Sequence, residues 1–220
     1  MVQVVGILGF KGSGKDTAGE YLVREHGFVV ESFANPLKDL IAAVFGWDRA
    51  LLEGNTTDSR TWRETPDEWW EAKLDWANNP GNYLGRFTPR VAMQVIGTDV
   101  MRKHFDDGLW IKSLEYRLQG KDRVVVTDCR FPNECKLIRD YSGVLFRVKR
   151  GPEPSWFETA RAAALGTETA QAVMEVLYPT VHISEWAWLG EQAALLENDG
   201  SIQDLYGKTE CLLTTHFKKS

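Results

Sequence analysis

The sequence predicts an α/β fold in which a parallel β-sheet is flanked by helices in three layers. Strand-like apolar runs and helical repeats alternate along the first 45 residues, and this order favours right-handed βαβ units. The first run, residues 2–8, is apolar almost throughout. A strand without polar alternation is buried on both faces, as is typical of parallel sheets covered by helices.

Five strands are expected, each an apolar run bounded by turn residues: residues 2–8, 28–33, 124–126, 144–148 and 193–196. Between them, apolar residues at helical spacing predict helices that begin near Lys15, Asn35, Thr88, Leu109, Asn133 and Ser201. Asn35 is the expected N-cap of the second helix, with Pro36 in its first turn. Asp106 and Asp107 are the expected caps of the helix over residues 109–118. Ile202, Leu205 and Tyr206 are expected to face inward in the terminal helix.

Two segments depart from this pattern and are predicted to be insertions in a single domain over residues 1–220. Residues 47–85 are rich in tryptophan and charged residues, with a helix expected around residues 66–76. These tryptophans either stack on a base or pack the insertion onto the body, and packing is the favoured interpretation. Residues 151–180 contain an alanine- and glutamate-rich helical stretch between two strands, which suits a lid.

Charge and composition exclude several classes of protein. The net charge of −5 disfavours a nucleic-acid-binding surface. Cys129, Cys135 and Cys211 lack metal-ligand spacing, which favours reduced thiols in a cytoplasmic protein. Neither a leader segment nor an apolar run of membrane-spanning length is evident, so we expect no membrane partner.

Residues 9–17, Gly-Phe-Lys-Gly-Ser-Gly-Lys-Asp-Thr, lie where the first strand meets the first helix. Their spacing matches the phosphate-binding pattern G-x-x-x-x-G-K at the strand-to-helix junction that such a loop requires. Backbone amides there and the start of the helix favour bound anions. The predicted phosphate-binding residues are Lys11, Gly12, Ser13, Gly14, Lys15, Asp16 and Thr17, with Lys15 reaching the β- and γ-phosphates.

Asp16 occupies the position where Ser or Thr normally contacts Mg²⁺. A carboxylate there suits a metal role, direct or through water, because it would repel a bare phosphate. The alternative is an acid that merely stabilises the first helical turn. Asp128 ends an apolar strand, where ligands of open α/β sheets bind, and is the second predicted metal residue. Its alternative is a surface ion pair with Arg130.

Further candidates lie between these elements. A helical pattern is interrupted by the poor helix formers Gly97, Thr98 and Asp99. This indicates either a binding site for a substrate that accepts a phosphoryl group or a kink filled by close packing. Asp99 would bind a hydroxyl or amino group of that acceptor substrate, and Arg90 would bind its phosphate. Arg150 and Lys149 would stabilise the charge on a phosphoryl group during its transfer. Arg60 and Arg63 are weaker candidates, and His182 and Glu185 are expected to be structural.

Together these residues resemble the deoxynucleoside monophosphate kinases of tailed bacteriophages. The resemblance rests on Ser13 to Thr17, Arg90, Met93-Gln94, Gly97-Thr98-Asp99, Trp110-Ile111-Lys112, Thr127 to Arg130, Val148 to Arg150, His182 to Glu185 and Asn198 to Ser201. The G-K-D-T sequence, unusual for a phosphate loop in general, fits this family. More distantly, the loop and the T-D-x-R strand end are similar to animal phosphomevalonate kinases.

The resemblance implies a P-loop kinase fold with a moving lid, a homodimer, and transfer of the ATP γ-phosphate to a deoxynucleoside 5′-monophosphate. ATP and Mg²⁺ are the implied cofactors. The catalytic residues are then Lys15, Asp16, Asp128, Arg130 and Arg150, and the acceptor-binding residues are Arg63, Arg90, Gln94, Thr98, Asp99 and Arg130. Two alternatives stay open, namely a kinase of another phosphorylated small molecule and a regulatory protein that binds ATP without transferring phosphate.

Overall fold

The computed structural model describes residues 2–217 and contains the predicted parallel sheet. Its strands run in the order β2-β3-β1-β4-β5. They are β1 (Gln3–Leu8), β2 (Val29–Glu31), β3 (Arg123–Val126), β4 (Val144–Lys149) and β5 (Ala194–Glu197). β1 lies in the centre, where Gly6 pairs with Val126 of β3 and with Leu145 of β4. All five predicted strands are confirmed.

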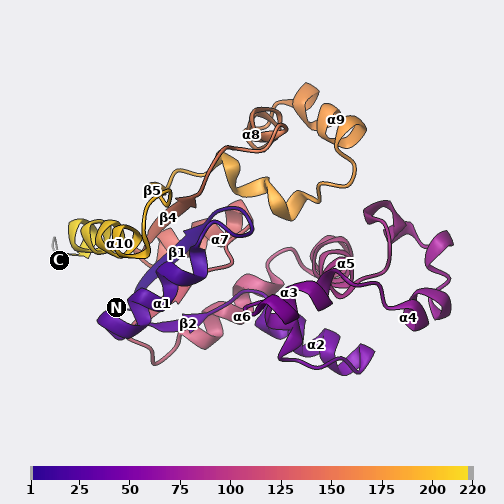
Figure 1. The fold of residues 1–220 in the computed structure, drawn as a ribbon, viewed down its shortest axis with the longest axis horizontal. Coiled ribbons are helices and arrows are strands. Elements are labelled where there is room, and N and C mark those ends of the chain that lie inside the picture. Colours follow the sequence, from indigo (N-terminus) through magenta and orange to yellow (C-terminus); the bar gives the residue numbers. More distant parts are fainter. Residues whose placement is uncertain (1, 218–220) are drawn as a thin grey trace.

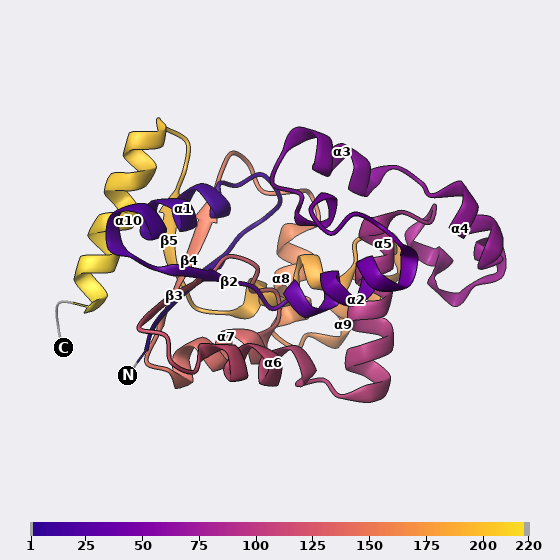
Figure 2. The same ribbon diagram turned by 90° about the horizontal axis from the view of Figure 1, so that it is seen from below.

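Helices cover both faces of the sheet, as the apolar sequence of β1 indicates. Figure 2 shows α1 (Lys15–His26) and α10 (Ile202–Phe217) on one side, and α6 (Leu109–Leu118) and α7 (Pro132–Asp140) on the other. Val5 and Ile7 of β1 are buried in the first layer, whereas Val4 and Leu8 are buried in the second. Because all strand pairs are parallel, the carboxyl ends of the strands lie at one edge, where ligands of such sheets bind.

Three expected helix ends differ from the structure. α2 spans Asn35–Phe45 and its N-cap is Ala34 rather than Asn35, because Asp128 accepts the Ala34 N–H. α6 begins after Gly108, whose N–H is accepted by Asp106, while Asp107 pairs with Arg102 instead. In α10, Leu205 is buried but Ile202 is exposed, so the expected inward position of Ile202 was wrong.

The insertion over residues 47–85 is more helical than predicted. It contains α3 (Thr57–Glu64), α4 (Glu68–Lys73) and 3₁₀ turns at Leu51–Glu53, Trp76–Asn78 and Pro80–Leu84. The expected helix near residues 66–76 corresponds to α4. α3 was not expected because its sequence carries almost no apolar repeat, and a capping box between Thr56 and Ser59 stabilises its start. The packing interpretation is confirmed for Trp47, Trp62, Trp70 and Trp76, whereas Trp69 is exposed.

The helix that begins after Thr88 changes its character at Val95. α5 (Pro89–Gln94) continues into η4 (Val95–Phe105), which is a π-helix. A Cβ added to Gly97 would lie 2.4 Å from Leu37 Cδ2 of α2, and Trp110 donates its indole N–H to the Gly97 carbonyl at 2.9 Å. Close packing therefore accounts for Gly97. Val100, in the π-helix, is exposed.

The lid-like segment forms a lobe beside the sheet, built from α8 (Phe157–Ala164) and α9 (Glu168–Leu177) (Figure 1). Phe10 of the phosphate loop packs against Trp156, directly before α8, with ring centres 5.4 Å apart, and against Trp188 of the turn Ala187–Gly190, with ring centres 5.1 Å apart. Short turns at Ile183–Glu185 and Ala187–Gly190 return the chain to β5.

Within residues 2–217, none of the helices is long and apolar enough to span a membrane. All three cysteines are free thiols, of which Cys129 and Cys135 are buried.

Candidate active site

The phosphate loop is held against the ends of β4 and β5 by contacts that only glycine permits. Gly9 has φ +141°, and a Cβ there would lie 2.4 Å from the Val148 carbonyl oxygen. Gly14 has φ +104°, and its Cβ would lie 2.4 Å from Asn198 Nδ2. That amide donates to the Ser13 carbonyl at 2.8 Å. Since both positions lack room for a side chain, the loop geometry requires these glycines.

The loop presents hydrogen-bond donors and a positive charge that a phosphate group could bind. Ser13 Oγ is buried without a hydrogen-bond partner among the described residues. Lys15 Nζ donates to the Phe10 carbonyl at 2.8 Å. Burial and the nearby Arg130 guanidinium lower the pKa of Lys15 to about 8, and the surrounding carboxylates only partly offset this. Lys11 and Gly12 are exposed beside it.

Arg150 lies at the same loop. A small cavity is lined by Phe10 to Ser13, Arg147 to Arg150 and Glu153, and Arg150 is exposed at its edge. Asp199 accepts the N–H of Gly151 at 2.7 Å, which fixes the start of the lid-like segment next to β5. The predicted neighbourhood of Arg150 and the loop is thus present.

The two predicted metal residues differ in their surroundings. Asp16 is exposed in the first turn of α1, next to partly buried Thr17. Asp128 Oδ1 accepts the Phe33 N–H at 3.1 Å. Asp128 Oδ2 accepts from Ser32 Oγ at 2.6 Å and from the Ala34 N–H at 3.0 Å. The alternative of an Asp128–Arg130 surface pair was wrong, because Arg130 pairs with Glu185.

Glu185 joins two predicted acceptor-binding arginines. Its Oε1 accepts from Arg90 Nη2 at 2.7 Å and from Arg130 Nη1 at 2.8 Å. Burial raises the pKa of Glu185, but the charges of Arg130 and Arg90 outweigh this and lower it to about 2. The carboxylate is therefore ionised at any working pH.

A third arginine completes this cluster. Arg63 Nη1 donates to the Glu53 carbonyl at 3.2 Å, while its buried Nε has no partner among the described residues. Burial, Arg90 and Arg130 lower the pKa of Arg63 to about 10. Arg60, on the same helix, instead bonds exposed carbonyls of Gly54 and Asn55. We call Arg63, Arg90 and Arg130 the arginine cluster.

Asp99 lies between the insertion and the segment that follows α9. Its Oδ2 accepts from Tyr83 Oη at 2.8 Å, and His182 Nε2 lies 3.7 Å from its Oδ1. Nδ1 of His182 accepts the Ser184 N–H at 3.2 Å, which assigns the ring proton to Nε2. Burial raises the pKa of Asp99, but His182 and Tyr83 more than offset this and keep it below its ordinary value. Gln94 and Thr98, on the same helical segment, are partly buried.

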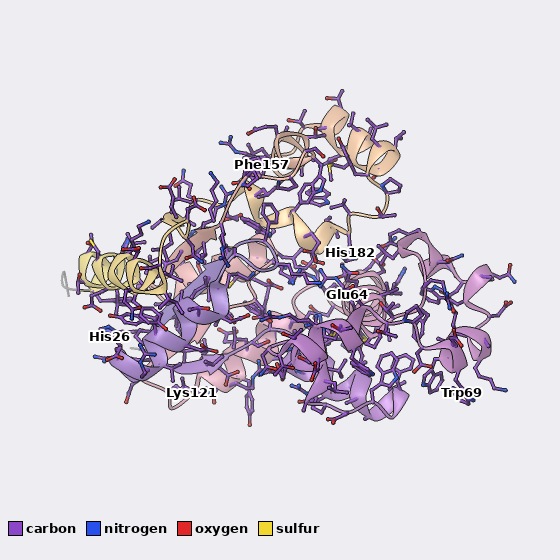
Figure 3. The ribbon with its side chains drawn as sticks, viewed as in Figure 1. His26, Glu64, Trp69, Lys121, Phe157 and His182 are labelled. Atoms are coloured by element: carbon purple, nitrogen blue, oxygen red, sulfur yellow. The ribbon has the colours of Figure 1, made fainter. Side chains whose placement is uncertain are left out.

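Three contributors to this region were not predicted as site residues: Glu185, Glu64 and Tyr83. Glu64 Oε1 accepts from Lys11 Nζ at 2.6 Å and lies 3.7 Å from Arg90 Nη1. Figure 3 shows Glu64, at the end of α3, and His182 in the central region of the view, below the α8–α9 lobe. Glu185 follows His182 by three residues in a turn without periodicity, so the signal in the sequence was its place in the motif His182 to Glu185 that supports the family resemblance.

Comparison with known proteins identifies the family. A family model described as deoxynucleotide monophosphate kinase matches residues 71–159. A protein of Acanthamoeba polyphaga mimivirus, assigned as a deoxynucleotide monophosphate kinase, is 32% identical over 160 residues, which cover 67% of this chain and 74% of that protein. The chain belongs to the deoxynucleotide monophosphate kinase family.

Two phage relatives extend this result. The deoxynucleoside-5′-monophosphate kinase of Escherichia phage T5 is 25% identical over 182 residues, covering 64% of this chain and 73% of that enzyme. The deoxynucleotide monophosphate kinase of Escherichia phage RB69 is 24% identical and covers 96% of this chain and 100% of the phage enzyme. The resemblance noted in the sequence is thereby confirmed for this deoxynucleotide monophosphate kinase.

Proposed function

We propose that this kinase holds the phosphate of a deoxynucleoside 5′-monophosphate in the arginine cluster, while the phosphate loop holds ATP. The reaction of the family then passes the γ-phosphoryl group of ATP to the acceptor and yields a diphosphate and ADP. One observation carries the proposal: Arg63, Arg90 and Arg130 converge from three segments, yet Arg63 Nε is buried without a partner. A buried guanidinium N–H without a hydrogen-bond partner is costly, and an oxygen of a phosphate dianion would accept that bond and add negative charge.

The position of Arg130 supports a role between the two substrates. Its charge lowers the pKa of Lys15, so the guanidinium lies near the phosphate-loop amine as well as near Arg90. We therefore assign Arg130, together with Arg150 at the loop, to the phosphoryl group during transfer. A separate general base is unnecessary, because the acceptor phosphate oxygen is ionised near neutral pH.

Mg²⁺ is proposed to bind with the ATP phosphates near Asp16 and Asp128. No cluster of three potential protein ligands is present within residues 2–217, which suits an ion that usually takes one or two carboxylates plus substrate oxygens. Asp16 is exposed beside the loop and fits this role. Asp128 already accepts three hydrogen bonds, so its contact is proposed to run through water. The ion would neutralise charge on the phosphates.

Lid closure and dimer formation remain predictions. Closure of residues 151–180 over the phosphate loop would exclude water and suppress ATP hydrolysis. Sedimentation analysis of the purified chain would test the homodimer implied by the resemblance.

The proposal is tested by ADP release with a panel of deoxynucleoside monophosphates and non-nucleotide phosphates such as phosphomevalonate, using native enzyme and Arg90→Ala. Native enzyme should respond to at least one deoxynucleotide. In Arg90→Ala, the KM for that acceptor should rise about 10- to 100-fold, as expected when a charge-assisted hydrogen bond is lost, with the KM for ATP within about twofold.

Arg139→Ala is the matched control, since Arg139 pairs with Glu191 away from the cluster and should leave both constants unchanged. Release with phosphomevalonate alone would reassign the enzyme to the small-molecule alternative. ATP binding without acceptor-dependent release would support a regulatory protein.

A further inference from the structure

We infer that Glu185 is a positioning residue for the acceptor: its carboxylate holds Arg90 and Arg130 together and sets the net charge of the arginine cluster. This inference rests on the proposed function, because it gives Glu185 a role only if these arginines bind the acceptor phosphate. Glu185 itself is not proposed to touch the reacting atoms.

The hydrogen bonds show how the positioning would work. Arg90 belongs to α5 and Arg130 to the loop after β3, so no shared element fixes their separation. Both donate to the same oxygen, Oε1 of Glu185, through one nitrogen each. A guanidinium has five N–H donors, so each arginine keeps donors for a phosphate. A single carboxylate oxygen can therefore set the distance between the guanidiniums without consuming their binding capacity.

Glu185 is itself held in place by the turn Ile183–Glu185. His182, with a side chain only 1% exposed, accepts the Ser184 N–H and so closes the start of the turn. The Ser184 carbonyl accepts a second bond from Arg130 Nη1 at 3.2 Å. Trp188 donates its indole N–H to the Glu185 carbonyl at 3.0 Å. The backbone under the carboxylate is thus fixed from both sides.

Charge balance gives the second argument. Three guanidiniums and one carboxylate leave two positive charges, which match a phosphate monoester carrying close to two negative charges near neutral pH. Glu64 also lies 3.7 Å from Arg90 Nη1, but it pairs more closely with Lys11 at 2.6 Å, so Glu64 and Lys11 together add no net charge. Without Glu185, three cations would face one another in a partly buried site. Their mutual repulsion would then separate the groups that the acceptor must bridge.

The opposite role would be competition, in which Glu185 occupies the place of the phosphate and must be displaced. The two roles differ in sign. A positioning carboxylate, once neutralised, weakens acceptor binding. A competing carboxylate, once neutralised, strengthens it.

Steady-state kinetics of Glu185→Gln in the full-length enzyme separates them. We expect kcat/KM for the deoxynucleoside monophosphate to fall about 10-fold or more, mainly through KM, with the KM for ATP within about twofold. Glu191→Gln is the matched control, because Glu191 is equally buried (17% against 18% exposed) and pairs with Arg139 outside the site. It should leave all constants unchanged. Glu185→Asp, which keeps the charge, should recover part of the loss and also serves if the Gln variant is unstable.

A double-mutant cycle with Arg90→Ala completes the test. If Glu185 acts through Arg90, adding Glu185→Gln to Arg90→Ala should cost less than about threefold, far below its cost in native enzyme. A lowered acceptor KM in Glu185→Gln, or equal costs in both backgrounds, would overturn the inference. If Arg90→Ala alone left the acceptor KM unchanged, the proposed phosphate site would fail instead.

Discussion

At the scale of single residues, the buried positive charges of the site lower the stability of the protein when no substrate is bound. The pKa of Arg63 is lowered to about 10 by burial and by two neighbouring arginines, and that of Lys15 to about 8. A lowered pKa in a cationic group means that folding disfavours its charged form. Such groups oppose stability where they are needed for binding, as is common at functional sites.

Replacing Arg63 by methionine should therefore stabilise the free enzyme while weakening acceptor binding. The flexible thioether fills similar space and removes the buried charge, at the loss of one bond to the Glu53 carbonyl. We expect a gain of about 1 kcal/mol, or about 2–4 °C in Tm for a chain of this size, and an acceptor KM raised about 10-fold or more. Thermal unfolding and ADP release measure the two effects.

Arg60→Met is the control, since Arg60 lies on the same helix but bonds only exposed carbonyls. Its free energy of unfolding should change by less than about 0.5 kcal/mol, and its kinetic constants should stay normal. A clear loss of stability in Arg63→Met would show that Arg63 is already well compensated in the free protein.

Lys15 predicts an alkaline limit to ATP use. The profile of kcat/KM reports the free enzyme, in which the pKa of Lys15 is about 8. The amine is protonated below that pH and loses its charge above it, so kcat/KM for ATP should fall about 10-fold from pH 7 to pH 9. Lys15→Arg, whatever its absolute rate, should lack this limb because arginine stays charged. The measurement needs an acceptor whose base does not ionise between about pH 7 and pH 9. If the alkaline decrease in kcat/KM persisted in Lys15→Arg, Lys15 would be excluded as its source.

At the scale of elements, the π-helix η4 depends on a close approach to α2. A methyl group at Gly97 would meet Leu37 Cδ2 at 2.4 Å, and Leu37 is buried in the core. Overpacking should cost about 1–3 kcal/mol, more than the gain of up to about 1 kcal/mol from replacing glycine in a helix. Gly97→Ala should thus lower Tm by about 2–6 °C and raise the acceptor KM, because Asp99 follows two residues later.

Gly207→Ala provides a control of opposite sign. Gly207 lies in the exposed interior of α10, and a Cβ there meets no atom within 4 Å. Its replacement should stabilise the protein by up to about 1 kcal/mol. If Gly97→Ala were equally stabilising, Leu37 would have room to move and the packing account of Gly97 would fail.

The elements also show what the sequence could predict. Strands such as residues 2–8 were predictable because burial on both faces leaves an apolar run, and the phosphate loop because its glycines and lysine have a fixed spacing. α3 was not, since a capping box rather than an apolar repeat stabilises it. The π-helix and the role of Glu185 were not either. Both depend on partners far away in sequence, Leu37 for one and Arg90 with Arg130 for the other.

At the scale of the whole molecule, Asp99 links three separate segments. Tyr83 comes from the insertion, Asp99 from η4 and His182 from the turn after the α8–α9 lobe. The Tyr83 bond is direct at 2.8 Å, whereas His182 Nε2 is 3.7 Å from Asp99. An acceptor group bound by Asp99 would therefore affect the insertion and the turn Ile183–Glu185 together.

Hydrogen exchange followed by mass spectrometry should detect this link. Adding the deoxynucleoside monophosphate alone should slow exchange in residues 80–84 and in residues 182–185 together, because both segments border Asp99. ATP alone should slow exchange in residues 9–17 and 149–151, which border the phosphate loop. Local opening sets these rates, so the two ligands should give distinct maps.

Tyr83→Phe tests whether the insertion responds to the acceptor through the Tyr83–Asp99 hydrogen bond, because it removes the hydroxyl that bonds Asp99 and leaves the ring in place. Acceptor-dependent protection of residues 80–84 should shrink in this variant while that of residues 182–185 persists, since His182 reaches Asp99 from the other side. Equal loss in both segments would mean that Tyr83 holds Asp99 itself in place. Protection confined to residues 182–185 in native enzyme would show instead that residues 80–84 of the insertion do not respond to the acceptor.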